Sequence, residues 1–169
     1  MIYFTSDLHL GHQKVIPKRH RPYETADEMT RDIADKFNSV VGENDTVYIL
    51  GDLCGDLSPQ QANELIASLH GRKHLLIGNH DPAYDPSLFE EMRDFLLTEI
   101  NGRYFAMMHY PLLAWPKIKK GCIQVHGHLH SDMGYNLKNR EDGILRYDVG
   151  VEANGFVPVS IDRIIDFFS

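Results

Sequence analysis

Short apolar runs of strand length recur in the first half of the chain, each ending in polar residues or glycine, and this pattern restricts the fold most. The runs are residues 2–6, 46–50 and 73–77, and glycine directly follows the last two. Continuous apolar runs of this length are typical of buried strands in an α/β sheet. The sequence therefore predicts three strands of this kind.

Two amphipathic helices are predicted between these strands. Thr25 and Glu28 have the spacing of a capping box, and apolar residues then recur at helical spacing up to Val41. Ser58 and Pro59 are residue types that begin a second helix, which Gly71 ends. The order strand, helix, strand, helix, strand is a βαβ arrangement.

The second half of the chain is richer in predicted strands. Residues 95–100 and 104–108 flank Asn101-Gly102, which is the sequence of a type I′ hairpin turn. Three further strands and a short helix are expected at 122–126, 145–149, 157–161 and 162–168. Together these elements predict an α/β fold, a four-layer sandwich of two mixed β-sheets flanked by α-helices, in one domain over residues 1–169.

Composition excludes several classes of protein. With 43% hydrophobic and 24% charged residues and no apolar run of about 18 residues, the chain is neither disordered nor membrane-spanning. The first residues lack the features of a signal peptide, so we expect a cytoplasmic protein with Cys54 and Cys122 as reduced thiols. A net charge of −7 argues against strong non-specific nucleic-acid binding, although a nucleotide substrate stays compatible with it.

Potential metal ligands directly follow the predicted strands. They are Asp7, His9, Asp52, Asn79, His109, His128 and His130. Ligands of open α/β sheets bind beyond the carboxyl ends of strands, so these side chains are expected at one site. In extended segments, residues two apart point to the same side, which would let Asp7 and His9 share one metal. His128 and His130 have the same spacing, and Gly51, Gly78 and Gly127 would permit close backbone approach.

The donor types indicate which metals could bind. Carboxylate, amide oxygen and imidazole form a mixed oxygen and nitrogen site, which suits transition metals better than calcium. The seven ligands are too many for one tetrahedral ion, whereas two ions that share a bridging carboxylate would use them all. We therefore expect two divalent metal ions, with Mn²⁺ first and Fe, Zn²⁺, Ni²⁺ or Mg²⁺ as alternatives.

The order of these motifs resembles the calcineurin-like metallophosphoesterase superfamily. The five blocks are Asp7-Leu8-His9, Gly51-Asp52, Gly78-Asn79-His80-Asp81, His109 and Gly127-His128-Leu129-His130. The opening segment, residues 3–12, is similar to that of small single-domain bacterial and phage phosphoesterases. No single block is specific, but five in this order are.

The resemblance implies a role for each residue of the blocks. Asp7, His9 and His130 would bind the first metal, and Asn79, His109 and His128 the second. Asp52 would bridge the two metals. His80 is the expected proton donor to the leaving group, and Asp81 would orient its imidazole. A water activated by the metals would then attack the phosphate ester.

Residues outside the blocks give weaker indications. His12, Arg19, Arg21 and Asn154 are predicted substrate contacts. The basic segments 14–21 and 117–120 could both border the site, or both could be solvated surface. Asp56 could lie near the site or cap a loop. For His126, a position behind the ligands or on the outer face of the sheet is favoured over metal binding.

The predicted function is hydrolysis of phosphate esters, with phosphodiesters favoured over monoesters. The substrate would be a small phosphate ester, a nucleotide or a nucleic-acid end, and no membrane partner is expected. Two alternatives stay open, namely a non-catalytic metal-binding interaction module on the same fold and a phosphomonoesterase or protein phosphatase. The sequence names neither the physiological substrate nor an oligomeric partner.

Overall fold

The predicted βαβ strands form the centre of a five-stranded sheet in the computed structural model, which describes residues 1–169. In spatial order the strands are β4 (Glu91–Arg93), β3 (Arg72–Leu76), β2 (Thr46–Ile49), β1 (Ile2–Thr5) and β9 (Val159–Ser160). The first four of these are parallel to one another, and β9 pairs antiparallel with β1. The carboxyl ends of β1, β2 and β3 therefore lie along one edge.

A second sheet contains the four strands of the later part of the chain. They are β5 (Phe95–Ile100), β6 (Arg103–Met108), β7 (Ile123–His126) and β8 (Arg146–Asp148), in that spatial order. β5 and β6 form the predicted hairpin, and both turn residues have positive φ, 52° at Asn101 and 77° at Gly102, as a type I′ turn requires. β6, β7 and β8 are parallel, so their carboxyl ends also meet at one edge.

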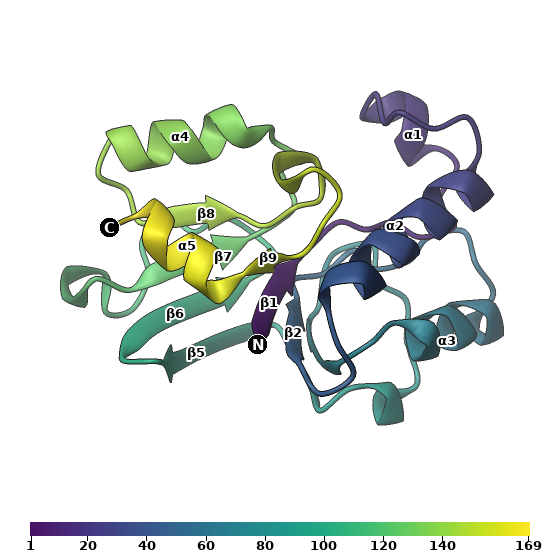
Figure 1. The fold of residues 1–169 in the computed structure, drawn as a ribbon, viewed down its shortest axis with the longest axis horizontal. Coiled ribbons are helices and arrows are strands. Elements are labelled where there is room, and N and C mark those ends of the chain that lie inside the picture. Colours follow the sequence, from purple (N-terminus) through teal and green to yellow (C-terminus); the bar gives the residue numbers. More distant parts are fainter.

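Helices cover the outer faces of the two sheets (Figure 1). α2 (Ala26–Val40) and α3 (Pro59–Ser68) lie on the first sheet, and both begin with the predicted caps, at Thr25 and Ser58. α4 (Met133–Glu141) lies over β8, and α5 (Ile161–Phe167) follows β9. The remaining helical segments are short: α1 (Val15–Lys18) and three single 3₁₀ turns at Pro86–Leu88, Ile118–Lys120 and Glu152–Asn154.

Two apolar cores hold these layers together. One core lies between the first sheet and its helices, where Ile33 and Phe37 of α2 contact strand residues such as Val47. The other joins the inner faces of the two sheets and includes Phe4 of β1 and Phe105 of β6, whose rings stack at 5.6 Å. The predicted four-layer sandwich is confirmed.

Helix α4 is the one long element that hydrophobic periodicity failed to predict. Its buried side chains are Asn136 and Asn139 rather than apolar residues. Asn136 donates to the carbonyl of Asp148 and accepts from its N–H, so a hydrogen-bonded pair attaches the helix to β8. A helix held in this way has no apolar stripe to detect. The short edge strand β4 was missed because it has no alternating apolar pattern.

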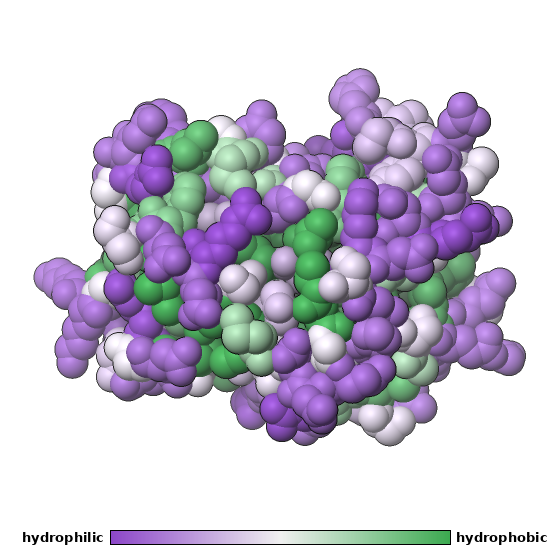
Figure 2. Space-filling model, in the orientation of Figure 1, coloured by the Kyte–Doolittle hydropathy of each residue, from purple (hydrophilic) through white to green (hydrophobic).

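The distribution of hydrophilic and apolar residues on the surface can be compared with the arrangement of the helices. On the face shown in Figure 2, hydrophilic residues cover the region of α1 and α2, and apolar residues lie mainly near the centre. No helix combines the length and the apolar character needed to cross a lipid bilayer.

Candidate metal centre

The loops that carry the ligands continue the parallel pairing of β1 with β2. The N–H of Asp7 donates to the carbonyl of Gly51, and the N–H of His9 donates to the carbonyl of Asp52, both at 3.0 Å. A bridge between Ser6 and Gly150 joins the end of β1 to the segment after β8 in the second sheet. The two sheets therefore bring their carboxyl ends to one place, and the ligands lie there.

The backbone of these loops is left-handed rather than extended. Five of the predicted ligands have φ between 49° and 71°: Asp7, His9, Asp52, His128 and His130. The interpretation of Asp7 with His9 and of His128 with His130 as extended pairs is therefore wrong. Left-handed backbone is unfavourable for most residues, tolerated best by Asp, Asn and His, and concentrated at functional sites.

Glycines permit the close approach of these loops, as predicted. A Cβ on Gly51, whose φ is 88°, would lie 2.6 Å from Nδ1 of His109 and from the backbone of Gly78. A Cβ on Gly127 would overlap Ser6 Oγ and Asp7 Oδ2. Only glycine fits at these positions while the ligands keep their places.

The first group of ligand atoms surrounds one point. Ligand atoms of Asp7, His9 and His130 all lie within 4.8 Å of one another. Asp7 Oδ1 is 3.6 Å from His130 Nε2, and Asp52 Oδ2 is 3.5 Å from His9 Nε2. All four side chains are nearly buried, so the group is shielded from solvent.

The second group lies on the other side of Asp52. Asp52 Oδ2 is also 3.5 Å from His109 Nε2, so this oxygen lies between the two groups. Asn79 Oδ1 lies 3.0 Å from both His109 Nε2 and His128 Nδ1. His109 Nδ1 donates to the carbonyl of Leu50 at 2.7 Å, so its Nε2 presents a lone pair to the group.

These atoms are suited to bind divalent cations. Asp7 Oδ1 and His9 Nε2 are buried without any hydrogen-bond partner. Burial, together with the carboxylates of Asp148, Glu152 and Asp52, raises the pKa of Asp7 well above its usual range. Buried polar atoms without partners and repelling carboxylates are costly, and a bound cation removes both costs. The donor atoms of the first group therefore fit a divalent metal ion.

Glu152 and Arg21 support the first group from behind. Glu152 Oε1 accepts from His130 Nδ1 at 2.9 Å, which leaves His130 Nε2 facing Asp7. Arg21 donates from Nε to the same Glu152 oxygen at 2.9 Å. Its terminal nitrogens donate to the carbonyls of Leu8 and Asp7 at 2.8 and 2.6 Å.

The prediction that Arg21 contacts the substrate is therefore wrong. The guanidinium is fully buried, and its donors are occupied by protein groups. Glu152 belongs to none of the sequence motifs and was not predicted as a functional residue. Asn154, a predicted substrate contact, is buried and bonds Tyr147 and the carbonyls of Asp148 and Gly150, so it fixes a turn.

Asp81 also differs from its predicted role. Its carboxylate accepts from the N–H groups of Asp52, Leu53 and Gly78 and from the hydroxyl of Tyr84. It makes no hydrogen bond with the His80 imidazole, so it joins the Asp52 loop to the Gly78 loop instead. The N–H of His80 donates to Asp52 Oδ1 at 2.8 Å, which leaves Asp52 Oδ2 to face both groups.

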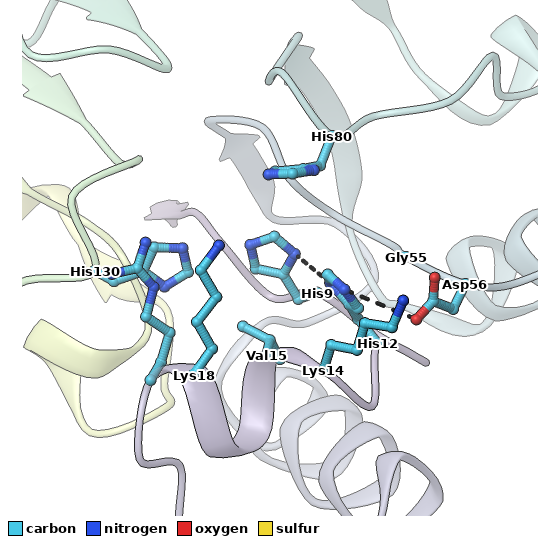
Figure 3. A pocket seen from close by; sticks show the side chains of 10 residues that line it. His9, His12, Lys14, Val15, Lys18, Gly55, Asp56, His80 and His130 are labelled. Carbon is cyan, nitrogen blue, oxygen red and sulfur yellow. Dashed lines mark hydrogen bonds and ion pairs between the residues drawn. The ribbon is translucent and has the colours of Figure 1, made fainter.

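A cavity of about 340 Å³ opens beside the first group (Figure 3). Its lining residues are His9, His12, Lys14, Val15, Lys18, Arg19, Gly55, Asp56, His80 and His130. His12 Nδ1 lies 3.2 Å from His9 Nδ1, and His12 Nε2 lies 3.8 Å from Asp56, as the dashed lines in Figure 3 show. The predicted substrate contacts His12 and Arg19 therefore border the site.

The basic segment 117–120 and His126 both lie away from the cavity. None of the lysines in 117–120 lines it, and the ammonium of Lys117 lies over the Tyr104 ring. His126 is buried behind the ligands, where Nδ1 donates to the carbonyl of Gly127 and Nε2 lies 3.3 Å from the Tyr135 hydroxyl.

Comparison with known proteins places this site in a family. The family model of calcineurin-like phosphoesterases matches residues 1–153. The chain belongs to this family. It is 33% identical to the uncharacterized protein MJ1445 of Methanocaldococcus jannaschii, over 97% of this chain and 89% of that protein. It is 30% identical to the Gene 66 protein of Mycobacterium phage L5, over 97% of this chain and 92% of that protein.

A solved structure has the same fold. The crystal structure of AQ665 from Aquifex aeolicus, a protein of unknown function, superposes with a TM-score of 0.76 at 27% identity. The alignment covers 98% of this chain and 97% of that chain. Membership of this family makes the chain a hydrolase of phosphate esters with a divalent-metal site, and it leaves the substrate and the metal open.

Proposed function

We propose that this phosphoesterase hydrolyses phosphodiesters with two divalent metal ions, Mn²⁺ first among them. The observation that carries the proposal is the position of Asp52 Oδ2, 3.5 Å from the ligand nitrogens of His9 and His109. A single carboxylate oxygen between two groups of donors is what a bridged pair of metals needs. When bound, the metals would lower the pKa of a water molecule and offset negative charge on the phosphoryl oxygens.

The protein side chains supply the remaining functions. Asp7, His9 and His130 would hold one ion, Asn79, His109 and His128 the other, and Asp52 both. The exposed His80 lines the cavity with its ring 5.6 Å from that of His9, so it can reach a leaving oxygen. An imidazole there can donate the proton that the leaving group requires.

A diester is favoured because the cavity provides room beside the metals for a second substituent. Its volume of about 340 Å³ lies within the range of small-ligand pockets, roughly 300–1,000 Å³. A phosphomonoester would leave this space unused. A phosphopeptide would need additional contact surface for its chain.

The test compares rates on bis(p-nitrophenyl) phosphate, p-nitrophenyl phosphate and a phosphopeptide, with Mn²⁺, Ni²⁺ or Zn²⁺ added. We expect the diester to be hydrolysed fastest, and Asp52→Asn to abolish the activity, which excludes a contaminating enzyme. Faster hydrolysis of the monoester or the phosphopeptide would refute the diester preference. Failure to hydrolyse any of the three with each metal would favour the non-catalytic binding module.

A further inference from the structure

Three cations line the cavity on the side of α1. They are Lys14, Lys18 and Arg19, and their side chains form no ion pair or hydrogen bond with the protein. Four of the chain's other cations are paired with carboxylates, namely Arg21, Lys36, Arg93 and Lys138, so what distinguishes Lys14, Lys18 and Arg19 is their common position at the cavity. Figure 3 shows Lys18 extending from α1 toward the level of His9 and His130. We call these three residues the α1 cations.

The segment that carries the α1 cations is held firmly. Val15 and Ile16 are 3% and 6% exposed and pack in the core under the first sheet. Arg21, at the end of the segment, is bonded to the backbone of the metal loop. Cations on an anchored segment lose little freedom when a ligand binds, so they bind anions better than cations on a flexible loop.

The charge at the cavity exceeds what one diester requires. The whole chain carries a net charge of −7, yet the only carboxylate that lines the cavity is Asp56, which lies next to His12. Two bound divalent ions, held by the carboxylates of Asp7 and Asp52, would leave about two positive charges, which is enough for the single charge of a scissile phosphodiester. The α1 cations are therefore available for a second anionic group, and a concave site concentrates their field.

The lining also indicates a highly polar ligand. Val15 is the only hydrophobic residue among the ten that line the cavity. Apolar ligands require mainly apolar walls, whereas Lys and Arg side chains suit phosphate oxygens.

We propose that the α1 cations bind a second, non-scissile phosphate, so that the substrate class is a phosphodiester that carries a further phosphate group. This rests on the proposed phosphodiesterase function. The metals would hold the scissile phosphate, and Lys14, Lys18 and Arg19 would hold the second phosphate at the other side of the cavity.

The experiment uses a matched pair of substrates on the full chain loaded with Mn²⁺. One is the p-nitrophenyl ester of thymidine 5′-phosphate, and the other is the same ester with an added 3′-phosphate. The test variant is Lys18→Ala with Arg19→Ala. The control is Lys119→Ala with Lys120→Ala, which removes the same charge from an exposed loop outside the cavity.

We expect wild type to prefer the 3′-phosphorylated ester by about 10-fold or more in kcat/KM, because charged hydrogen bonds to phosphate are strong. This ratio should fall to about one in the test variant, stay unchanged in the control, and decrease with added salt. A wild-type ratio of one, or equal losses on both esters in the test variant, would overturn the inference.

Calorimetric binding of thymidine 3′,5′-bisphosphate and thymidine 5′-monophosphate separates this inference from the proposed function. If neither ester is hydrolysed but the bisphosphate binds more tightly in wild type and control only, the phosphodiesterase function fails and the phosphate subsite stands. Equal binding of the two nucleotides to wild type would refute the subsite whether or not hydrolysis occurs.

Discussion

Replacing Glu152 with Gln should weaken the binding of the first metal ion and leave the binding of the second unchanged. Glu152 belongs to neither group of predicted ligands, but its Oε1 accepts from His130 Nδ1 at 2.9 Å and from Arg21. Gln keeps the size of the side chain and removes its charge. The imidazole of His130 then loses the anionic partner that fixes its tautomer and direction.

The size of the effect follows from two contacts. Loss of a carboxylate behind a ligating histidine typically costs about 10- to 100-fold in metal affinity, and we expect that range for the first ion. The change also leaves the fully buried guanidinium of Arg21 without its countercharge. Removing one partner of a buried ion pair costs about 3–5 kcal/mol, and a retained amide oxygen should reduce this to about 2–3 kcal/mol in the free energy of unfolding.

The assay is stepwise Mn²⁺ binding by titration calorimetry, with unfolding of the metal-free protein in urea measured alongside. Glu91→Gln is the matched control, because Glu91 Oε1 lies 3.0 Å from His74 Nδ1, in a similar pair remote from the metal centre. Circular dichroism checks that each variant is folded before metal is added.

Three results would refute the reasoning. One is an unchanged affinity for both ions in Glu152→Gln. The second is an equal loss at both sites, which would mean that Glu152 acts on overall stability and not on His130. The third is the same loss of metal in Glu91→Gln, since that change leaves the metal centre untouched.

Other predictions concern the leaving group, the loop packing and the thiols. The His80→Ala variant should keep both metals and hydrolyse esters with poor leaving groups most slowly relative to wild type. Rates on a series of esters with graded leaving-group pKa would measure this, and loss of a metal in the variant would mean that the role of His80 is misassigned. Gly127→Ala should lower the free energy of unfolding by about 1–3 kcal/mol and release metal, because its Cβ overlaps Ser6 and Asp7, as urea titration and metal analysis would report. Burial raises the pKa of Cys54 to about 12 and that of Cys122 above its usual value, so neither thiol should react with a disulfide reagent at about pH 8 until denaturant is added.

The position of the candidate ligands could be predicted from the sequence because each lies next to a chain feature with a strong local signal. Asp7, Asp52 and Asn79 follow the predicted strand runs within one or two residues, and parallel strands bring their ends together whatever the intervening loops do. The local conformation was predicted wrongly at the same places. Left-handed backbone at Asp7 and His9 follows from tertiary pairing with the next loop, which no sequence period encodes.

Supporting residues were harder to predict because their partners are distant in sequence. Arg21 and Glu152 are 131 positions apart, and neither belongs to a motif. A basic residue in a basic segment suggests exposure, yet burial of Arg21 depends on a carboxylate from the opposite end of the chain. Asp81 was misassigned for a related reason: its neighbour in sequence is His80, but its partners in space are backbone N–H groups.

The segment 14–21 connects the proposed phosphate subsite with the candidate metal centre. Its outward residues, Lys18 and Arg19, line the cavity, and its inward end, Arg21, fixes the carbonyl of Asp7 and the carboxylate of Glu152. Val15 and Ile16 anchor the start of the segment in the core, and Arg21 anchors its end, so Lys18 and Arg19 lie between two fixed points. The arrangement of the metal ligands and the position of the proposed phosphate subsite therefore depend on one short stretch of chain, and relatives that keep the ligands while changing this stretch should differ in substrate rather than in chemistry.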